Sequence, residues 1–278
     1  MVSMAKNNGA SRLAGWRVWV QAGFLLAWLD PLLLRMHTVC GPVFHCYSCP
    51  LATFACPIGV LANFSALHMV PFAALGILLI VGAVVGSLVC GWACPFGFLQ
   101  DLMARIPTPK FTLPAWMGLF RYVVLAAFVL AVPFLWGESH PLFICRLCPT
   151  GAIEAALPYT AQTAIAGGPI AWPSATKMTI LAAMLAAMLF VWRPWCTLFC
   201  PLGAIYGLMN HVSFFFLRFD RDHCGGCSTC RSLCADGGRR QHRFDGVRCV
   251  RCLECTKCHA VRVDTILARA DKPPLQRD

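Results

Sequence analysis

Charged side chains are scarce in this sequence. Only 13% of the 278 residues are charged, whereas 58% are hydrophobic, and an average soluble domain carries about 25% charged residues. This low content excludes an ordinary soluble domain and indicates a protein of the lipid bilayer. The charges that are present are mostly basic, 23 against 12 acidic. They gather beside apolar segments and in the C-terminal tail, so we expect membrane topology, and not nucleic-acid binding, to explain the net charge of +11.

Four segments are apolar enough to cross a hydrocarbon core, which takes a helix of about 17–25 residues. They lie near residues 18–34, 66–89, 115–136 and 176–192. No small-residue cleavage site follows the first segment, which predicts a retained anchor and not a secretory signal. Arg17 precedes the first segment, Arg105 separates the second from the third, and Arg193 ends the fourth. This pattern predicts a multi-pass protein of the bacterial inner membrane with both termini cytoplasmic.

The composition changes at residue 218, where the apolar runs stop and charged residues become dense. This change predicts a membrane domain over residues 1–217 and a soluble, cytoplasmic domain over residues 218–278, and the cysteine spacing of the second domain makes it ferredoxin-like. The membrane domain repeats itself, because each half has two apolar segments with cysteine motifs at their ends. The predicted fold class is an all-α membrane protein with four transmembrane helices in two pseudo-symmetric halves, plus a small C-terminal two-cluster ferredoxin-like module.

Cysteines are abundant, and eight of the 18 lie in the tail. A reducing cytoplasm disfavours a disulfide scaffold there, so metal ligation is the better interpretation. The tail cysteines form two runs: Cys224, Cys227, Cys230 and Cys234, then Cys249, Cys252, Cys255 and Cys258. The first run has the C-x2-C-x2-C-x3-C spacing of bacterial two-cluster ferredoxins, in which three cysteines hold one [4Fe-4S] cluster and the fourth holds the other. A pair of zinc sites is the alternative.

The tail runs depart from the ferredoxin pattern at two positions. Ala235 follows Cys234 where proline is usual, and Cys258 comes one residue early, so that His259 occupies the expected place. We favour Cys258 over His259 as the last ligand, because thiolate is the commoner ligand of these clusters.

The motif C-P-x-G occurs four times, at 56–59, 94–97, 148–151 and 200–203. Proline suits the first turn of a helix, so each motif predicts a helix start with its cysteine near the N-cap. The free N–H groups and the partial positive charge of a helix start stabilise thiolates. Glycine in turn lets the backbone come close.

The predicted topology sorts the remaining cysteines into an inner and an outer set. The inner set is Cys90, Cys94, Cys196 and Cys200, and the outer set is Cys46, Cys49, Cys56, Cys145 and Cys148. One pair from each half would supply the four thiolates of a cubane, which predicts one or two clusters besides the two in the tail. The alternatives are small buried cysteines in ordinary helices and, for the outer set, disulfides. Cys40 has no predicted role.

These motifs resemble those of the membrane-bound polyferredoxins of the NapH type, and related membrane parts occur in NosR-type and MauN-type proteins. The resemblance rests on the CGWACP segment at 90–95, the CTLFCP segment at 196–201 and the two tail runs. The cysteine-rich segment at 45–57 is closer to larger membrane polyferredoxins. The resemblance implies a quinol dehydrogenase or electron-transfer subunit of an oxidoreductase complex, with no catalytic acid or base to transfer.

The sequence thus predicts a subunit that moves electrons between the quinone pool and a partner redox enzyme, with a cytochrome or an iron-sulfur protein as carrier. A quinol site needs a proton acceptor, and His68 and His211 are candidates because each follows a C-P-x-G motif by a few helical turns. Haem is not expected, since no span carries a convincing histidine pair. The alternative function is an assembly or maturation factor that reduces metal centres or thiols of an exported enzyme.

Overall fold

The computed structural model describes residues 9–28, 56–111, 113–165, 167–168, 172–220, 224, 234, 246–258 and 260–266. Several residues singled out in the sequence lie outside these ranges: Cys40, Cys46, Cys49, Cys227, Cys230 and His259.

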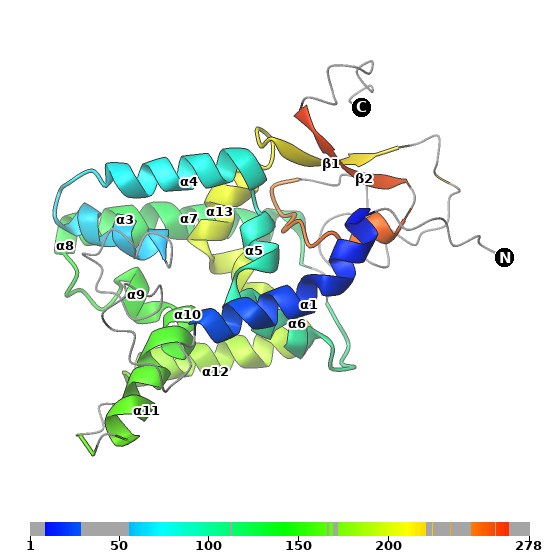
Figure 1. The fold of residues 1–278 in the computed structure, drawn as a ribbon. Coiled ribbons are helices and arrows are strands. Elements are labelled where there is room, and N and C mark those ends of the chain that lie inside the picture. The colour runs from blue at the N-terminus through cyan, green and yellow to red at the C-terminus, as the bar shows by residue number, and fades with distance from the viewer. Residues whose placement is uncertain are drawn as a thin grey trace.

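Helices form most of the described chain (Figure 1). The longer helices are α1 (Gly9–Trp28), α3 (Pro57–Ala66), α4 (Phe72–Val85), α6 (Pro95–Ala104), α11 (Leu157–Ile165), α12 (Ala175–Phe190) and α13 (Pro201–Met209). The shorter ones are α5 (Leu88–Trp92), α7 (Phe120–Val124), α8 (Val132–Trp136), α9 (Ile144–Leu147) and α10 (Pro149–Gly151). Two 3₁₀ helices, η2 (Ala115–Leu119) and η6 (Glu254–Lys257), and three π-helices, η3 (Leu125–Ala131), η4 (Ala152–Ala156) and η5 (Trp195–Phe199), complete the set in the described part.

Within the described ranges, one helix is long and apolar enough to cross a membrane, Trp116–Trp136. It joins η2, α7, η3 and α8 and coincides with the third predicted segment. The other apolar helices are too short: α4 has 14 residues and α12 has 16. At 1.5 Å per residue they reach about 21 and 24 Å, against a hydrocarbon core of about 30 Å. The prediction of four transmembrane helices in two pseudo-symmetric halves is therefore wrong.

Local backbone breaks explain why the second predicted segment, 66–89, is not one helix. His68 has a φ of 56° just after α3, and Gly86 has a φ of 57° at the end of α4. Both values lie in the left-handed region, where a right-handed helix cannot continue. The first predicted segment overlaps α1, in which Arg17 and Gln21 are buried against the rest of the protein. Its residues 29–34 lie outside the described part.

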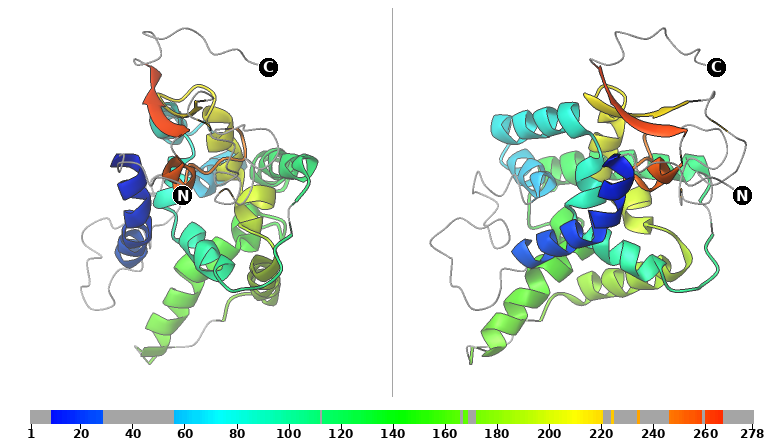
Figure 2. Two further views of the ribbon diagram at one scale, coloured as in Figure 1. Left: turned by 90° about the vertical axis from the view of Figure 1, so that its right-hand side faces the viewer. Right: turned by 45° about the vertical axis from the view of Figure 1, so that its right-hand side comes forward.

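A two-stranded antiparallel sheet corrects the all-α prediction. Strand β1 (Phe215–Phe219) pairs with strand β2 (Val261–Thr265), and Phe215 lies opposite Thr265. Both strands are rich in the aromatic and β-branched residues that favour extended backbone. The sheet lies at one end of the molecule and α11 at the other (Figures 1 and 2). The boundary at residue 217 stays a prediction, and β1 spans it.

Two apolar clusters position the cysteine motifs. Leu61, Leu78 and Tyr206 belong to the first cluster, which joins α3, α4 and α13 and includes Cys90. The second cluster consists of Phe96, Met188 and Trp195, from α6, α12 and η5, with Cys94 and Cys200 packed against it. The helix starts at Cys94 and Cys200 therefore pack on the core.

Candidate metal centre

The structure brings the inner cysteines together from two stretches about 100 residues apart. Cys90 lies in α5 and Cys196 in η5, both buried, whereas Cys94 and Cys200 are the N-cap residues of α6 and α13. The thiol of Cys200 interacts electrostatically with those of Cys196, Cys90 and Cys94, and Cys90 interacts with Cys196. We name these four residues the body site.

The two helix starts are built as the motif predicts. Pro95 and Pro201 occupy the first turn of α6 and α13, where a missing N–H costs nothing. The Cys94 Sγ accepts a hydrogen bond from the Gly97 N–H at 3.4 Å, and the Gly203 N–H acts on Cys200 in the same stabilising direction. The prediction of helix starts with cysteine at the N-cap is confirmed at both motifs.

The glycines of these two motifs, Gly97 and Gly203, pack on the carbonyl of the first cysteine of their C-x3-C pair. A Cβ added to Gly97 would lie 3.0 Å from the Cys90 carbonyl oxygen, and one added to Gly203 would lie 3.0 Å from the Cys196 carbonyl oxygen. These distances are too short for a side chain unless the backbone moves. The glycine therefore draws the helix start against the first cysteine of each C-x3-C pair.

Replacing Gly97 by alanine is expected to destabilise the body site by about 1–3 kcal/mol, since overpacking displaces backbone in a tightly packed region. The measurement is thermal unfolding of the purified protein together with its iron content. Gly151→Ala is the matched control, because it changes the same motif where a Cβ meets only the Lys177 Nζ, at 3.7 Å. An equal loss of stability in the two variants would contradict the role given to Gly97.

Gln100 is a site residue that the sequence did not reveal. It is fully buried in α6, and its Nε2 donates a hydrogen bond to the Cys196 Sγ at 3.1 Å. Its Oε1 accepts from the Trp195 N–H at 3.2 Å, in the same π-helix as Cys196. The signal in the sequence is weak, a single glutamine six residues after Cys94 in an otherwise apolar helix start.

Burial dominates the acid strength of the body-site thiols. It raises the pKa of Cys90 to about 12, and it also raises the pKa values of Cys196 and Cys200. The guanidinium of Arg193 and the N–H of Gly203 act in the opposite direction but do not outweigh it. The helix starts therefore do not by themselves make thiolates, and the positive charge of a metal bound by these thiols would supply the missing stabilisation.

A second group of cysteines forms in the tail. The Cys255 thiol interacts electrostatically with Cys252, Cys249 and Cys234, so the last cysteine of the first run joins three cysteines of the second. We name these four residues the tail site. Their grouping is the one that the two-cluster ferredoxin spacing predicts. Cys224 and Cys258 are also described, but their expected partners Cys227 and Cys230 lie outside the described ranges.

Hydrogen bonds hold the tail backbone on the helical body. The Asn210 Nδ2 donates to the Cys249 carbonyl at 2.9 Å, and the Ser87 hydroxyl donates to the same carbonyl at 2.5 Å. Arg251 is 2% exposed, and its two terminal nitrogens donate to the carbonyls of Val85 and Asn210, each at 3.0 Å. These contacts bring the tail site next to the body site.

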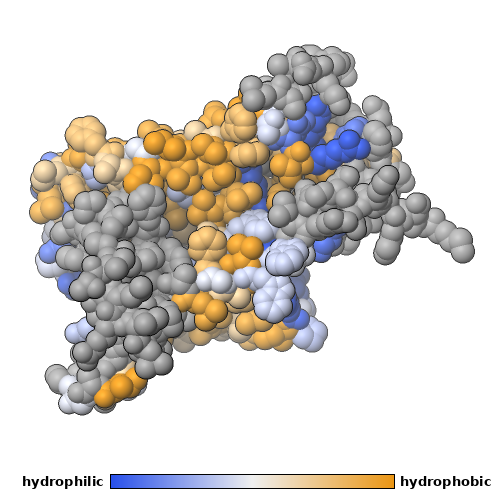
Figure 3. All heavy atoms as spheres, in the orientation of Figure 1, coloured by the Kyte–Doolittle hydropathy of each residue, from blue (hydrophilic) through white to orange (hydrophobic). Residues whose placement is uncertain are grey.

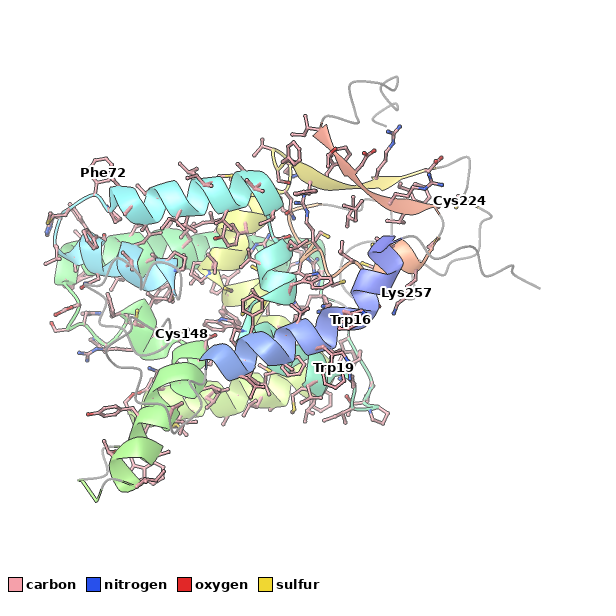
Figure 4. The ribbon with its side chains drawn as sticks, viewed as in Figure 1. Trp16, Trp19, Phe72, Cys148, Cys224 and Lys257 are labelled. Carbon is pink, nitrogen blue, oxygen red and sulfur yellow. The ribbon has the colours of Figure 1, made fainter. Side chains whose placement is uncertain are left out.

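The described outer cysteines lie near the same core. Cys148 packs on the cluster of Phe96, Met188 and Trp195, and Cys145 packs on the cluster that includes Cys90. Cys56 precedes α3 and is exposed. Cys148 and Cys224 lie far apart in Figure 4, on the α9 and β-sheet sides of the view. The division of the cysteines into an inner and an outer set depended on the four-span topology. Because that topology is wrong, it no longer supports the division.

In the described ranges, no three Cys, His, Asp or Glu side chains are arranged to hold a single metal ion. A cubane makes a different demand, since each of its four irons takes one thiolate. Four thiols from two motifs, with N–H, amide and guanidinium groups beside them, match that demand.

The two candidate quinone-site histidines differ in their surroundings. The His68 ring contacts the Phe134 ring at a centroid distance of 4.4 Å. Phe134 also lines a surface hollow of about 350 Å³ beside η3 and α8, together with Ser65, Ala126, Leu130, Ala131 and Leu135. His211 lies exposed in the turn after α13. His68 thus contacts a residue that lines this hollow, although it is not itself part of the lining, whereas His211 is exposed elsewhere.

Comparison with known proteins agrees with the cysteine sites. The 4Fe-4S binding domain family matches residues 67–114 and 177–220, the two stretches that contain the body-site cysteines. The chain is 25% identical to the ferredoxin-type protein NapH of Haemophilus influenzae, over 58% of this chain and 52% of NapH. The resemblance to NapH-type polyferredoxins is confirmed. The matched family binds 4Fe-4S clusters and the named relatives are ferredoxin-type or electron transport proteins, so electron transfer and [4Fe-4S] binding now rest on the matches as well as on the spacing.

Two further relatives extend the comparison. The methylamine utilization ferredoxin-type protein MauN of Methylorubrum extorquens is 29% identical, over 67% of this chain and 57% of MauN. An uncharacterised protein of Methanocaldococcus jannaschii is 28% identical over 77% of this chain and 87% of that protein. The chain spans about half the length of NapH and MauN. No solved structure matches the chain.

Proposed function

We propose that this chain is a membrane electron-transfer subunit that moves electrons between the quinone pool and a partner redox enzyme through [4Fe-4S] clusters. The observation that carries the proposal is the grouping of Cys90, Cys94, Cys196 and Cys200, from both stretches of the 4Fe-4S family match, with the tail backbone packed against Gly91, the residue after Cys90. Two neighbouring cysteine sets would hold two clusters between which an electron can transfer.

The proposed ligand sets follow from the groupings. The body site holds one cluster, and the tail site, Cys234 with Cys249, Cys252 and Cys255, holds a second. Cys224, Cys227, Cys230 and Cys258 hold a third. Bound clusters supply one-electron redox chemistry, and the protein supplies thiolates, the N–H of Gly97 and the amide of Gln100 toward the sulfur atoms.

A place at a membrane is supported by the apolar surface. Hydrophobic side chains gather over α4 (Figure 3), where Phe72, Leu79 and Ile80 are 79%, 54% and 66% exposed. The candidate span adds Trp116 and Trp136, 72% and 58% exposed near its two ends, as tryptophans at membrane interfaces are. Contiguous apolar surface of this kind marks contact with lipid or with a partner protein.

The surface hollow beside His68 is the proposed quinone site. Its lining is apolar apart from Ser65, whose hydroxyl donates to the Leu130 carbonyl at 2.9 Å. A π-helix, η3, forms part of the wall, and π-bulges often occur at functional sites. Oxidation of a quinol to a quinone releases two protons and two electrons, and His68 would accept one of the two protons as a general base.

Iron and acid-labile sulfide per purified chain, with EPR spectra after reduction, test the cluster assignment. We expect three or four cubanes, about 12–16 iron atoms. A measured content of only two cubanes would mean that the clusters lie in the tail alone. The body-site cysteines would then be ordinary buried residues and not ligands. A disulfide among the outer cysteines, found by mass spectrometry of the unreduced protein, would favour the maturation function.

Anaerobic addition of short-chain ubiquinol or menaquinol tests the quinone assignment separately. Cluster bleaching by quinol is expected in the native protein and is expected to slow in His68→Ala, whereas His211→Ala serves as the matched control. Slowing in His211→Ala alone would move the quinone site to the other histidine.

A further inference from the structure

We propose that a buried group of charges, Arg193 with Asp101 and Arg17, sets the reduction potentials of the body and tail sites and couples one to the other. The inference rests on the proposed function, because it presumes that both sites hold clusters.

The group joins three parts of the chain through ion pairs. The Arg193 Nε and Nη2 donate to the two carboxylate oxygens of Asp101 in α6, at 2.8 and 2.5 Å. Arg17 in α1 donates to the same carboxylate, and the Gln21 Nε2 donates to it at 3.3 Å. The side chains of Arg193, Arg17 and Asp101 are 0%, 8% and 13% exposed, so water screens them little.

Arg193 interacts with both cysteine sites. Its Nη1 donates to the Cys90 carbonyl at 3.1 Å, and its guanidinium interacts electrostatically with Cys196 of the body site and Cys252 of the tail site. Arg17 reaches the same junction, since its Nε donates to the Gly91 carbonyl at 3.0 Å and its charge also acts on Cys252. The charge of Arg193 thus acts on cysteines of both sites.

The backbone of Arg193 also indicates that its position is imposed by the fold. Its φ of 48° lies in the left-handed region, which non-glycine residues adopt only when the surroundings hold them there. A fully buried guanidinium in such a conformation requires compensation, and Asp101 alone cannot neutralise two arginines. Glu254 lies 3.8 Å from Arg17 but is 26% exposed and therefore screened. A cluster with its four thiolates carries a net negative charge, so clusters at the two cysteine sites would complete the balance.

The electrostatic consequence has a sign that can be tested. Reduction adds a negative charge to a cluster, and a nearby buried cation stabilises the reduced form. Removing the charge of Arg193 is therefore expected to lower the midpoint potentials of both sites. Removing the charge of Asp101 leaves the arginines uncompensated and is expected to raise them.

The experiment is an EPR-monitored redox titration of the purified, cluster-containing protein with Arg193→Gln and Asp101→Asn. We expect shifts of opposite sign, each of about tenfold in the equilibrium constant for one-electron reduction, or about 59 mV. Arg193→Lys, which keeps the charge, is expected to stay close to the native potentials. Arg218→Gln is the matched control, because Arg218 pairs with Asp264 in the β-sheet, at 3.5 Å, and not with the cysteine sites.

The outcomes separate this inference from the proposed function. Unchanged potentials, or shifts of the same sign in both charge variants with full iron content, would overturn the inference and leave the proposed function standing. Absence of cubane signals in the native protein would overturn the proposed function itself. Should Arg193→Gln fail to fold, the Asp101→Asn titration still decides the sign, since a shift to lower potential contradicts the inference.

Discussion

Cys196→Ala is expected to remove one cluster, about four iron atoms per chain, and to leave the tail clusters in place. The substitution takes away one of the four thiols of the body site, and the remaining three cannot bind all four irons. It also removes the shorter of the two hydrogen bonds that the buried Gln100 Nε2 donates, and leaves the one to the Phe96 carbonyl at 3.4 Å. Iron and sulfide analysis with EPR of the reduced protein measures the loss.

Cys255→Ala is the reciprocal variant. Cys255 is 6% exposed in the tail, and its loss is expected to remove the tail-site signal while the body-site signal stays. If Cys196→Ala keeps the full iron content, the body site is not a ligand set. If each variant loses both signals together, the two sites are one assembly and not two separate clusters.

Gly207→Ala is expected to detach the tail from the helical body. A Cβ at this position would lie 2.2 Å from the Val247 carbonyl oxygen, closer than any side chain can approach a backbone atom. The tail segment must shift, and its hydrogen bonds from Asn210 and Arg121 lengthen. We expect a loss of about 1–3 kcal/mol or more in unfolding free energy, and slower reduction of the tail site when electrons enter through the body site.

Thermal unfolding and stopped-flow reduction measure the two effects. Gly91→Ala, with the Val250 carbonyl oxygen 2.3 Å from the added Cβ, is expected to behave like Gly207→Ala. The matched control is Gly76→Ala, since this helical glycine has nothing within 4 Å of an added Cβ and alanine favours a helix there. If the tail site of Gly207→Ala is reduced at the native rate, the contact between Gly207 and Val247 does not hold the tail against the helical body.

The transmembrane prediction was wrong for a physical reason that composition cannot reveal. Hydropathy counts apolar residues over about 20 positions, but a helix ends wherever two or three residues leave the right-handed region. His68, Pro71 and Gly86 are such positions. In the third segment no such break occurs, so Trp116–Trp136 is continuous.

Arg193 shows that the structural role of a charged residue can also be misread from local sequence. In the sequence, Arg193 is a basic residue at the end of an apolar segment, and such a residue is interpreted as a signal of membrane topology. In the folded chain it is fully buried and paired with Asp101. Its partner is 92 residues away, and no local pattern links the two.

The sequence by itself determined the local chemistry of this protein. The spacing of the tail cysteines, the proline at the first turn and the cysteine at each N-cap depend on residues within one or two turns, which sequence fully specifies. Only the tertiary structure decided which groups face one another across the chain. Three contacts depend on it: the approach of Gly207 to the Val247 carbonyl, the hydrogen bond from the Gln100 amide to Cys196, and the interaction of the Arg193 guanidinium with cysteines of both sites. Each requires the packing of distant segments, because the shape of the core sets which groups meet.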